Sequence, residues 1–102
     1  IGTGYCPYTS AKAALEGYVK MISKEFSKDG VIVTAVSPGI VHTPGRYYAS
    51  LDSAEQEKYL NQYIPLGRFG RAEEVAKLVA YLSSDHAMYM AGSIVSIDGG
   101  AR

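Results

Sequence analysis

The chain has 102 residues, of which 47% are hydrophobic and 20% charged, and its formal net charge is zero; this composition indicates one small globular unit and excludes a disordered chain or a charge-driven nucleic-acid binder. A single cysteine, Cys6, excludes an internal disulfide, and His42 and His86 have no companions at metal-ligand spacing, so no metal site is predicted. No apolar run approaches the ~18 residues of a membrane-spanning helix, and we expect a cytoplasmic protein without a membrane partner.

The hydrophobic pattern predicts an α/β chain in which helices alternate with two strands. The first helix runs from about Tyr8 to Lys28, and Asp29-Gly30 ends it with a glycine suited to a helix C-cap. The run Val31 to Ser37 is almost entirely apolar and β-branched, as in a strand buried on both faces of a parallel sheet, and Pro38-Gly39 stops it. The later elements are a weak helix from Ser53 to Tyr63, a clear helix from Glu73 to Ser83, and a strand from Ile94 to Ile97.

Tyr8 and Lys12 lie on a helix face that otherwise carries apolar residues. An ammonium on that face is costly to desolvate unless it has a partner, and Tyr8 is its neighbour one turn away. Because a nearby positive charge favours the phenolate, Lys12 is expected to lower the pKa of Tyr8 from its usual value of about 10, which would make Tyr8 a general acid/base. The pair alone also fits a lysine whose stem packs beside a core tyrosine. The shared face consists of Tyr8, Lys12, Leu15, Val19, Ile22 and Phe26.

Further motifs follow Tyr8-x-x-x-Lys12 in a fixed order. They are Ser37-Pro38-Gly39-Ile40-Val41-His42-Thr43, Pro65-Leu66-Gly67-Arg68, Glu73-Glu74-Val75-Ala76 and the terminal Asp98-Gly99-Gly100. In this order and spacing, essentially the whole chain resembles the C-terminal portion of the classical short-chain dehydrogenases/reductases. The nearest-looking group is the 3-oxoacyl-carrier-protein reductase type, with related sugar or polyol dehydrogenases. The resemblance implies the C-terminal part of a doubly wound, parallel-sheet Rossmann fold.

The resemblance also implies a role for each matching residue. Tyr8 would donate a proton to the substrate oxygen during carbonyl reduction, or remove it during alcohol oxidation. Lys12 would lower the Tyr8 pKa and hold the nicotinamide ribose of NAD or NADP. Pro38-Gly39 would flank the nicotinamide and the backbone of Val41 would meet its carboxamide. The Thr43 hydroxyl would reach the carboxamide or the pyrophosphate region. Taken alone, Pro38-Gly39 also fits a plain strand-ending turn.

Other features of the family are not found in the sequence, among them its Gly-rich cofactor turn and the Asn and Ser that complete its active site. The stretch Gly2-Thr3-Gly4-Tyr5-Cys6-Pro7 has a proline where the third glycine belongs, and no strand precedes it. Ile32 and Thr34 replace an Arg and an Asn that are common in this strand. We therefore expect residues 1–102 to be the catalytic, substrate-side portion of a single Rossmann-type domain without its N-terminal cofactor-binding half.

The segment from Pro44 to Gln62 is rich in tyrosine and lies where the family keeps its variable substrate lid. Tyr47 and Tyr48 would either line an aromatic or acyl pocket or pack the lid onto the body. Farther along, the two arginines of Gly67-Arg68-Phe69-Gly70-Arg71 stand beside Glu73 and Glu74. This arrangement fits a solvated turn and a helix start better than a nucleic-acid patch.

Family members commonly associate through the first helix, whose side face here carries Ala11, Ala14 and Tyr18. We therefore expect a homodimer or homotetramer that acts on a small-molecule alcohol or carbonyl substrate. Two hypotheses from other functional classes stay open. One is a catalytically silent dinucleotide-fold module kept for oligomerisation, and the other is a Ser/Lys hydrolase built on Ser10 and Lys12. Helical positions 10 and 12 do not face each other, which argues against the hydrolase.

Overall fold

The computed structural model describes residues 4–46 and 50–102. The main elements are helix α1 (Cys6–Phe26), strand β1 (Ala35–Pro38), helix α2 (Ser53–Tyr63), helix α3 (Ala72–Leu82) and strand β2 (Ile94–Ile97). Two short 3₁₀ helices, η1 (Ser27–Asp29) and η3 (Asp85–Met90), follow α1 and α3. The predicted α/β class and the predicted order of helices and strands are confirmed.

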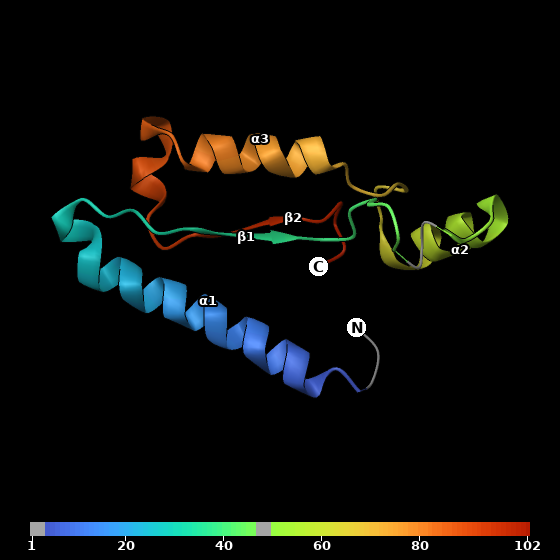
Figure 1. The fold of residues 1–102 in the computed structure, drawn as a ribbon, viewed down its shortest axis with the longest axis horizontal. Coiled ribbons are helices and arrows are strands. Elements are labelled where there is room, and N and C mark those ends of the chain that lie inside the picture. The colour runs from blue at the N-terminus through green and yellow to red at the C-terminus, as the bar shows by residue number, and fades with distance from the viewer. Residues whose placement is uncertain (1–3, 47–49) are drawn as a thin grey trace.

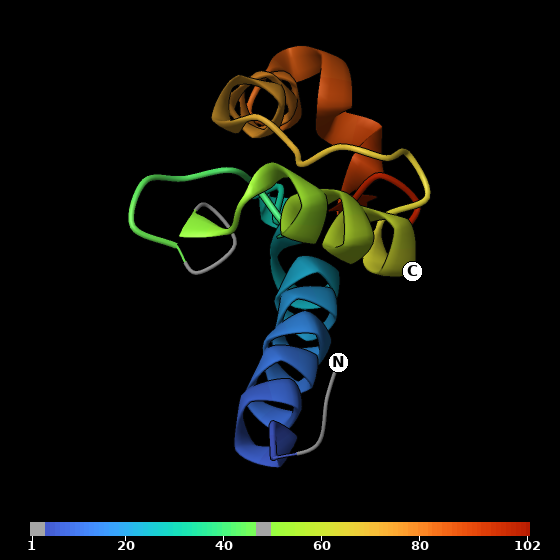
Figure 2. The same ribbon diagram turned by 90° about the vertical axis from the view of Figure 1, so that its right-hand side faces the viewer.

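The two strands form a small parallel sheet in which Ala35 pairs with Ile94 and Pro38 with Ile97. Parallel strands need a long crossover connection, which here contains α2, α3 and η3. Helix α3 lies on one side of the sheet and α1 on the other, whereas α2 lies beyond the carboxyl ends of the strands (Figures 1 and 2). The N-terminal half of α1 also extends towards that end, which is where open α/β sheets bind ligands.

Local sequence explains both ends of α1. Pro7 stands in the first turn, where its missing N–H costs no helical hydrogen bond. At the other end the chain tightens into η1 and stops at Gly30, whose φ of 82° lies in the left-handed region that glycine favours. The predicted glycine cap is therefore confirmed, although the α-helix proper ends at Phe26 and not at Lys28.

Helices α2 and α3 both begin with a carboxylate that binds backbone N–H groups. The Asp52 carboxylate accepts a hydrogen bond from the Glu55 N–H at 2.8 Å, and the Glu55 side chain accepts one from the Asp52 N–H at 3.4 Å. In α3, the Glu74 carboxylate accepts from the Arg71 N–H at 3.1 Å. These contacts satisfy donors that a helix start leaves unpaired, and both helices lie within one residue of their predicted bounds.

Strand β1 is shorter and less buried than predicted. The expected strand began at Val31, but β1 begins at Ala35, opposite Ile94. Before that point a backbone hydrogen bond from the Gly92 N–H to the Val33 carbonyl, at 2.7 Å, joins the two segments without extending the strand. The residues of β1 are half-buried up to an exposed Pro38, so the prediction of burial on both faces is wrong for this structure. The cause is visible in Figure 1, where α1 diverges from the sheet towards its own N-terminus.

The divergence of α1 also limits the face that was predicted to point inward. Val19 is buried and Ile22 is half-buried, whereas Leu15 is 54% and Tyr8 58% exposed. A Cβ atom on Gly92, just before β2, would lie 3.1 Å from the buried Ser23 hydroxyl, so the C-terminal half of the helix packs closely on the chain. The predicted inward face is therefore confirmed only for Val19 and Ile22, since Phe26 at the end of the helix is 44% exposed.

Candidate functional site

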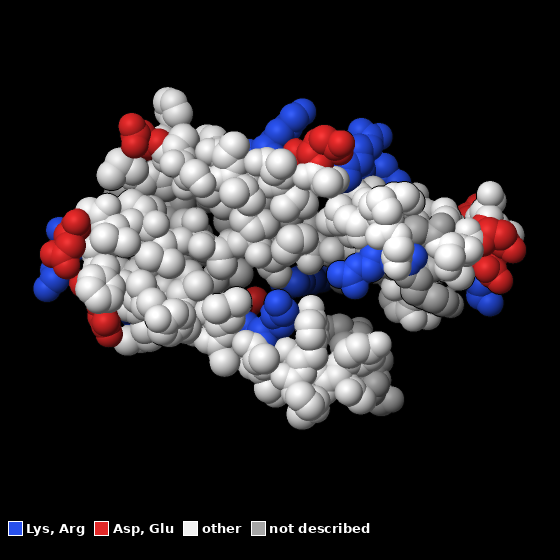
Figure 3. Space-filling view, viewed as in Figure 1, with Lys and Arg blue, Asp and Glu red and all other residues white. Residues whose placement is uncertain are grey.

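A groove of about 560 Å³ separates the N-terminal half of α1 from the carboxyl end of the sheet. Tyr8 and Lys12 line it from α1, and Pro38-Gly39 lines it from the end of β1. In Figure 3 the groove is the hollow between the lower part of the molecule and its main body, with basic side chains at its opening. The fold thus brings together the predicted proton donor, the predicted lysine and the Pro-Gly turn.

Lys12 approaches the ring of Tyr8 from one turn further along α1. The Lys12 Nζ lies 5.5 Å from the centroid of the ring, which is a cation–π distance. Both side chains are exposed on the wall of the groove. A phenol hydroxyl and an ammonium are therefore available to the same ligand.

Sequence reasoning missed two charged residues of the groove. Glu16 lines it one turn beyond Lys12, and the i,i+4 spacing was a signal that could have identified it. Arg102 also lines it, and the Arg102 Nε lies 3.6 Å from the Asp98 Oδ2. No local pattern could place Arg102 near Tyr8, because the approach depends on how the chain after β2 returns to the sheet.

Gly39 is required by the packing of the two strand ends. Its N–H donates a hydrogen bond to the Ile97 carbonyl at 2.9 Å. A Cβ atom at this position would lie 2.7 Å from both the Cα and the Cβ of Asp98, which no ordinary side chain tolerates. Gly39, which the resemblance places beside the nicotinamide, is therefore also in close contact with the neighbouring backbone.

Val41 and Thr43 lie farther along the same loop, beyond Ile40, where the lining of the groove ends. Val41 forms a parallel bridge with Gly70, in the segment that leads into α3. The Thr43 carbonyl accepts a hydrogen bond from the Arg46 N–H at 3.4 Å across a Pro-Gly turn. Val41 and Thr43, two of the predicted cofactor-binding residues, thus lie on the adjoining loop and do not line the groove.

A second cavity, of about 300 Å³, lies at the carboxyl end of β2. The Arg68 guanidinium at its edge donates two hydrogen bonds to the Glu74 carboxylate, at 2.6 and 3.2 Å. These hydrogen bonds, together with the one from the Arg71 N–H, lower the pKa of Glu74 to about 2. The turn and helix start predicted for residues 67–74 are confirmed. The lining consists of Ile40, Ile64, Leu66, Arg68, Gly70, Glu74, Ile97, Asp98 and Gly99.

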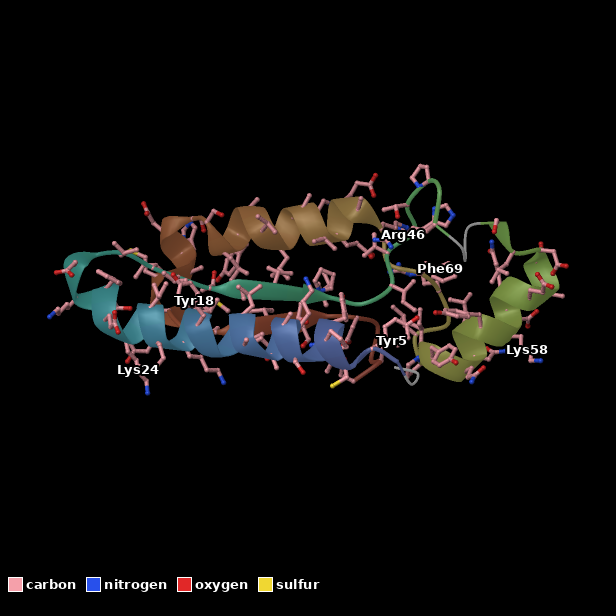
Figure 4. The ribbon with its side chains drawn as sticks, turned by 60° about the horizontal axis from the view of Figure 1, so that its bottom comes forward. Tyr5, Tyr18, Lys24, Arg46, Lys58 and Phe69 are labelled. Carbon is pink, nitrogen blue, oxygen red and sulfur yellow. The ribbon has the colours of Figure 1, made fainter. Side chains whose placement is uncertain are left out.

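Aromatic rings connect α2 to the loop after β1. The rings of Tyr59 and Tyr63 are 4.7 Å apart, Tyr59 and Phe69 are 6.3 Å apart, and Phe69 and His42 are 6.2 Å apart, between centroids. Figure 4 shows Phe69 between the part of the chain that carries Arg46 and helix α2. Tyr47 and Tyr48, for which a pocket or a packing role was predicted, lie outside the described residues.

Two kinds of feature are absent from residues 4–46 and 50–102. None of the helices in these ranges has the length and apolar character needed to span a membrane. The same ranges contain no group of three or more His, Cys, Asp and Glu side chains placed to hold a metal ion.

Comparison with known proteins identifies the family. Residues 1–102 match the family model described as enoyl-(acyl carrier protein) reductase. The 3-oxoacyl-[acyl-carrier-protein] reductase FabG of Pseudomonas aeruginosa is 42% identical over 97 residues, which cover 95% of this chain and 38% of that protein. The cyclohexanol dehydrogenase of a Rhodococcus species is 39% identical over 97 residues, covering 95% of this chain and 35% of the relative.

A probable 2,4-dienoyl-CoA reductase of Caenorhabditis elegans, decr-1.2, is 43% identical over 102 residues, covering 94% of this chain and 32% of the relative. The chain thus spans between 32% and 38% of the length of these relatives, all of them named as reductases or dehydrogenases. The predicted resemblance is confirmed, and the chain belongs to the short-chain dehydrogenase/reductase family, where it is similar to the 3-oxoacyl-acyl-carrier-protein reductases.

Proposed function

We propose that the intact protein is an NAD(P)-dependent oxidoreductase that interconverts an alcohol and a carbonyl group on a small-molecule substrate. The observation that carries the proposal is the groove in which Tyr8 and Lys12 face Pro38-Gly39 at the carboxyl end of the sheet. The relatives named as reductases and dehydrogenases support oxidoreduction. In this proposal residues 1–102 form the C-terminal, substrate-side part of a doubly wound Rossmann domain.

The groups on the groove wall fit the nicotinamide–ribose end of NAD or NADP. The Lys12 ammonium and the Tyr8 hydroxyl are suited to the hydroxyl groups of a ribose, and both are exposed on one wall. Pro38 and Gly39 form part of the opposite wall, against which a flat ring can lie. When bound, the nicotinamide would supply or accept the hydride, and a side chain of the protein would donate or accept the proton.

Tyr8 is the group that moves the proton. During reduction its hydroxyl donates a proton to the substrate oxygen, and during oxidation its phenolate removes the proton from the alcohol. In this proposal Lys12 assists the proton transfer from one turn further along α1, where its Nζ lies 5.5 Å from the centroid of the Tyr8 ring. Because Lys12 also holds the ribose, the same side chain contributes to both cofactor binding and proton transfer.

The test is a set of single substitutions in the intact protein. We expect Tyr8→Phe to lower turnover by about 10² or more, since it removes a positioned acid/base, with little change in the unfolding temperature. Lys12→Met should lower turnover and also raise the Kd of the cofactor. Tyr81→Phe on α3, where the ring is 50% exposed and lies outside the groove, is the matched control and should leave turnover unchanged.

Turnover of Tyr8→Phe within a factor of two of the parent would contradict the proton-transfer role. A parent protein that binds neither NADH nor NADPH in a titration would instead support the catalytically silent oligomerisation module.

A further inference from the structure

Gly70 holds the loop after β1 on both sides of Val41. The Gly70 N–H donates a hydrogen bond to the Ile40 carbonyl at 2.9 Å, and the Gly70 carbonyl accepts one from the His42 N–H, also at 2.9 Å. This parallel bridge uses the peptide groups of Ile40 and His42, and not those of Val41, to contact Gly70. The direction in which the Val41 peptide groups point therefore depends on where Gly70 lies.

The two segments also lie close together, so that even a small side chain on Gly70 would be in van der Waals contact with the loop. A Cβ atom on Gly70 would lie 3.4 Å from the Ile40 carbonyl oxygen and 3.5 Å from the Val41 Cγ2. The backbone of Gly70 is thus in direct contact with the loop, and a displacement of residue 70 would be transmitted to it.

The ion pair between Arg68 and Glu74 fixes the residues on either side of Gly70. The two side chains make a bidentate contact at 2.6 and 3.2 Å. Arg68 also donates from Nη1 to the Phe69 carbonyl at 3.1 Å, and Glu74 accepts from the Arg71 N–H at 3.1 Å. The pair therefore holds the peptides at positions 69 and 71, which flank the glycine that contacts the loop.

We infer that Arg68 and Glu74 are positioning residues that set residues 38–43 for the nicotinamide end of the cofactor, acting through Gly70. This inference rests on the proposed function and on the contact between the Val41 backbone and the nicotinamide carboxamide that the family resemblance implies. Neither side chain lines the groove of Tyr8; both line the second cavity, at the carboxyl end of β2. Their loss should therefore weaken cofactor binding without removing the proton donor.

The experiment compares Glu74→Gln with Glu73→Gln in the intact protein. Both substitutions remove one negative charge from the first turn of α3, but only Glu74 binds Arg68. We expect Glu74→Gln to raise the KM and Kd of the cofactor by about 3- to 30-fold, as for a coupled residue outside the site, and to change kcat much less. The KM of the carbonyl substrate and all constants of Glu73→Gln should stay close to those of the parent.

Hydrogen exchange without cofactor gives a second readout that does not depend on activity. The amides of Gly70 and His42 should exchange faster in Glu74→Gln than in Glu73→Gln, because the hydrogen bonds that join the two segments are less well held. If Glu74→Gln fails to fold, Arg68→Lys takes its place, since lysine keeps the charge but cannot form the bidentate contact.

The two proposals can fail separately. If Glu74→Gln and Glu73→Gln agree within a factor of two in cofactor KM and in amide exchange, while Tyr8→Phe abolishes turnover, the positioning role is wrong and the proposed function stands. If Tyr8→Phe has no effect, the proposed function is wrong, and equal exchange rates in the two glutamine variants would also reject the positioning role.

Discussion

Gly39 stands at the point where the two strand ends touch, and its lack of a side chain makes that contact possible. We expect Gly39→Ala to destabilise the intact protein by about 1–3 kcal/mol, as overpacking of a tight contact does. The added methyl would meet the backbone of Asp98 at 2.7 Å, and backbone cannot move aside as the tip of a flexible side chain can. Urea unfolding followed by circular dichroism measures the difference.

Gly17→Ala is the control for Gly39→Ala. A Cβ at Gly17, inside α1, would have nothing within 4 Å, so alanine should be neutral or slightly stabilising there. If Gly39→Ala is as stable as Gly17→Ala, the strand ends are not in the close contact that the structure shows.

Glu74 should make the stability of the protein depend on acid pH. Its pKa falls from 4.5 to about 2 in the folded state, because of the hydrogen bonds from Arg68 and from the backbone of Arg71. A carboxylate whose pKa is lower in the folded than in the unfolded protein stabilises the fold at pH values above its unfolded pKa. This contribution is lost as the pH falls from about 4.5 towards about 2. The stability difference between the parent and Glu74→Gln should therefore be larger at pH 7 than at pH 3.

The matched variant for this pH dependence is again Glu73→Gln, which lies outside the ion pair. The difference in folding stability between Glu73→Gln and the parent should change less between pH 7 and pH 3. An equal change for both variants would mean that the contact between Arg68 and Glu74 does not stabilise the folded protein.

At the residue scale, contacts could be predicted from the sequence where the two residues are also close along the chain. Tyr8 and Lys12 were predicted to be side by side because helical spacing alone places them so, and their ring-to-ammonium distance agrees. The contact of Gly39 with Asp98 could not be predicted, because it depends on the pairing of β1 with β2. The bridge between Val41 and Gly70 escaped prediction for the same reason.

The bounds of helices and strands were likewise predictable where residues close in sequence set them, and not where distant residues do. The bounds of α2 were predicted correctly because its start is set by a local signal, the capping residue Asp52 immediately before the helix. The start of β1 was predicted four positions too early, at Val31 instead of Ala35, because the apolar run begins before the residues that pair regularly with β2. A strand begins where its partner does, and a single run of sequence does not show that position.

Helix α1 offers a surface for self-association on the side away from the groove. Ala11 and Ala14 are exposed there, beside Tyr18, which is 62% exposed, and Met21, which is 54% exposed. Small residues let a second helix approach closely, and an isologous contact would join two copies of the same face. We expect the intact protein to be a homodimer or homotetramer, and Ala14→Arg to shift it towards smaller species in light scattering.

Lys20→Glu provides a control of this interface prediction, since it also alters charge on an exposed part of α1 but not on this face. A parent protein that is monomeric at micromolar concentration would contradict the predicted assembly.

At the scale of the whole molecule, the described residues bury little of their apolar surface. The molecule measures 51 × 30 × 23 Å, which is elongated for a chain of this length. Large apolar side chains lie exposed on several elements, including Leu15 on α1, Leu66 before α3 and Val79 on α3. The groove beside α1 is lined by residues of β1 and β2 that are half-buried or, at Pro38, exposed. We expect further protein surface to cover these faces in the intact protein.

We therefore expect residues 1–102, expressed alone, neither to bind a nicotinamide cofactor tightly nor to turn over a carbonyl substrate. The pyrophosphate of such a cofactor binds where a Gly-rich turn leads into a helix N-terminus, and no such motif occurs in this sequence. Each strand of the two-stranded sheet also has one edge without a partner strand, whose backbone N–H and C=O groups can pair with another chain and so favour aggregation. The isolated residues should bind a hydrophobic dye and lack near-ultraviolet circular dichroism, as loosely packed states do. A well-folded monomer of these residues that bound NADH at micromolar concentration would show that the cofactor site is complete within them.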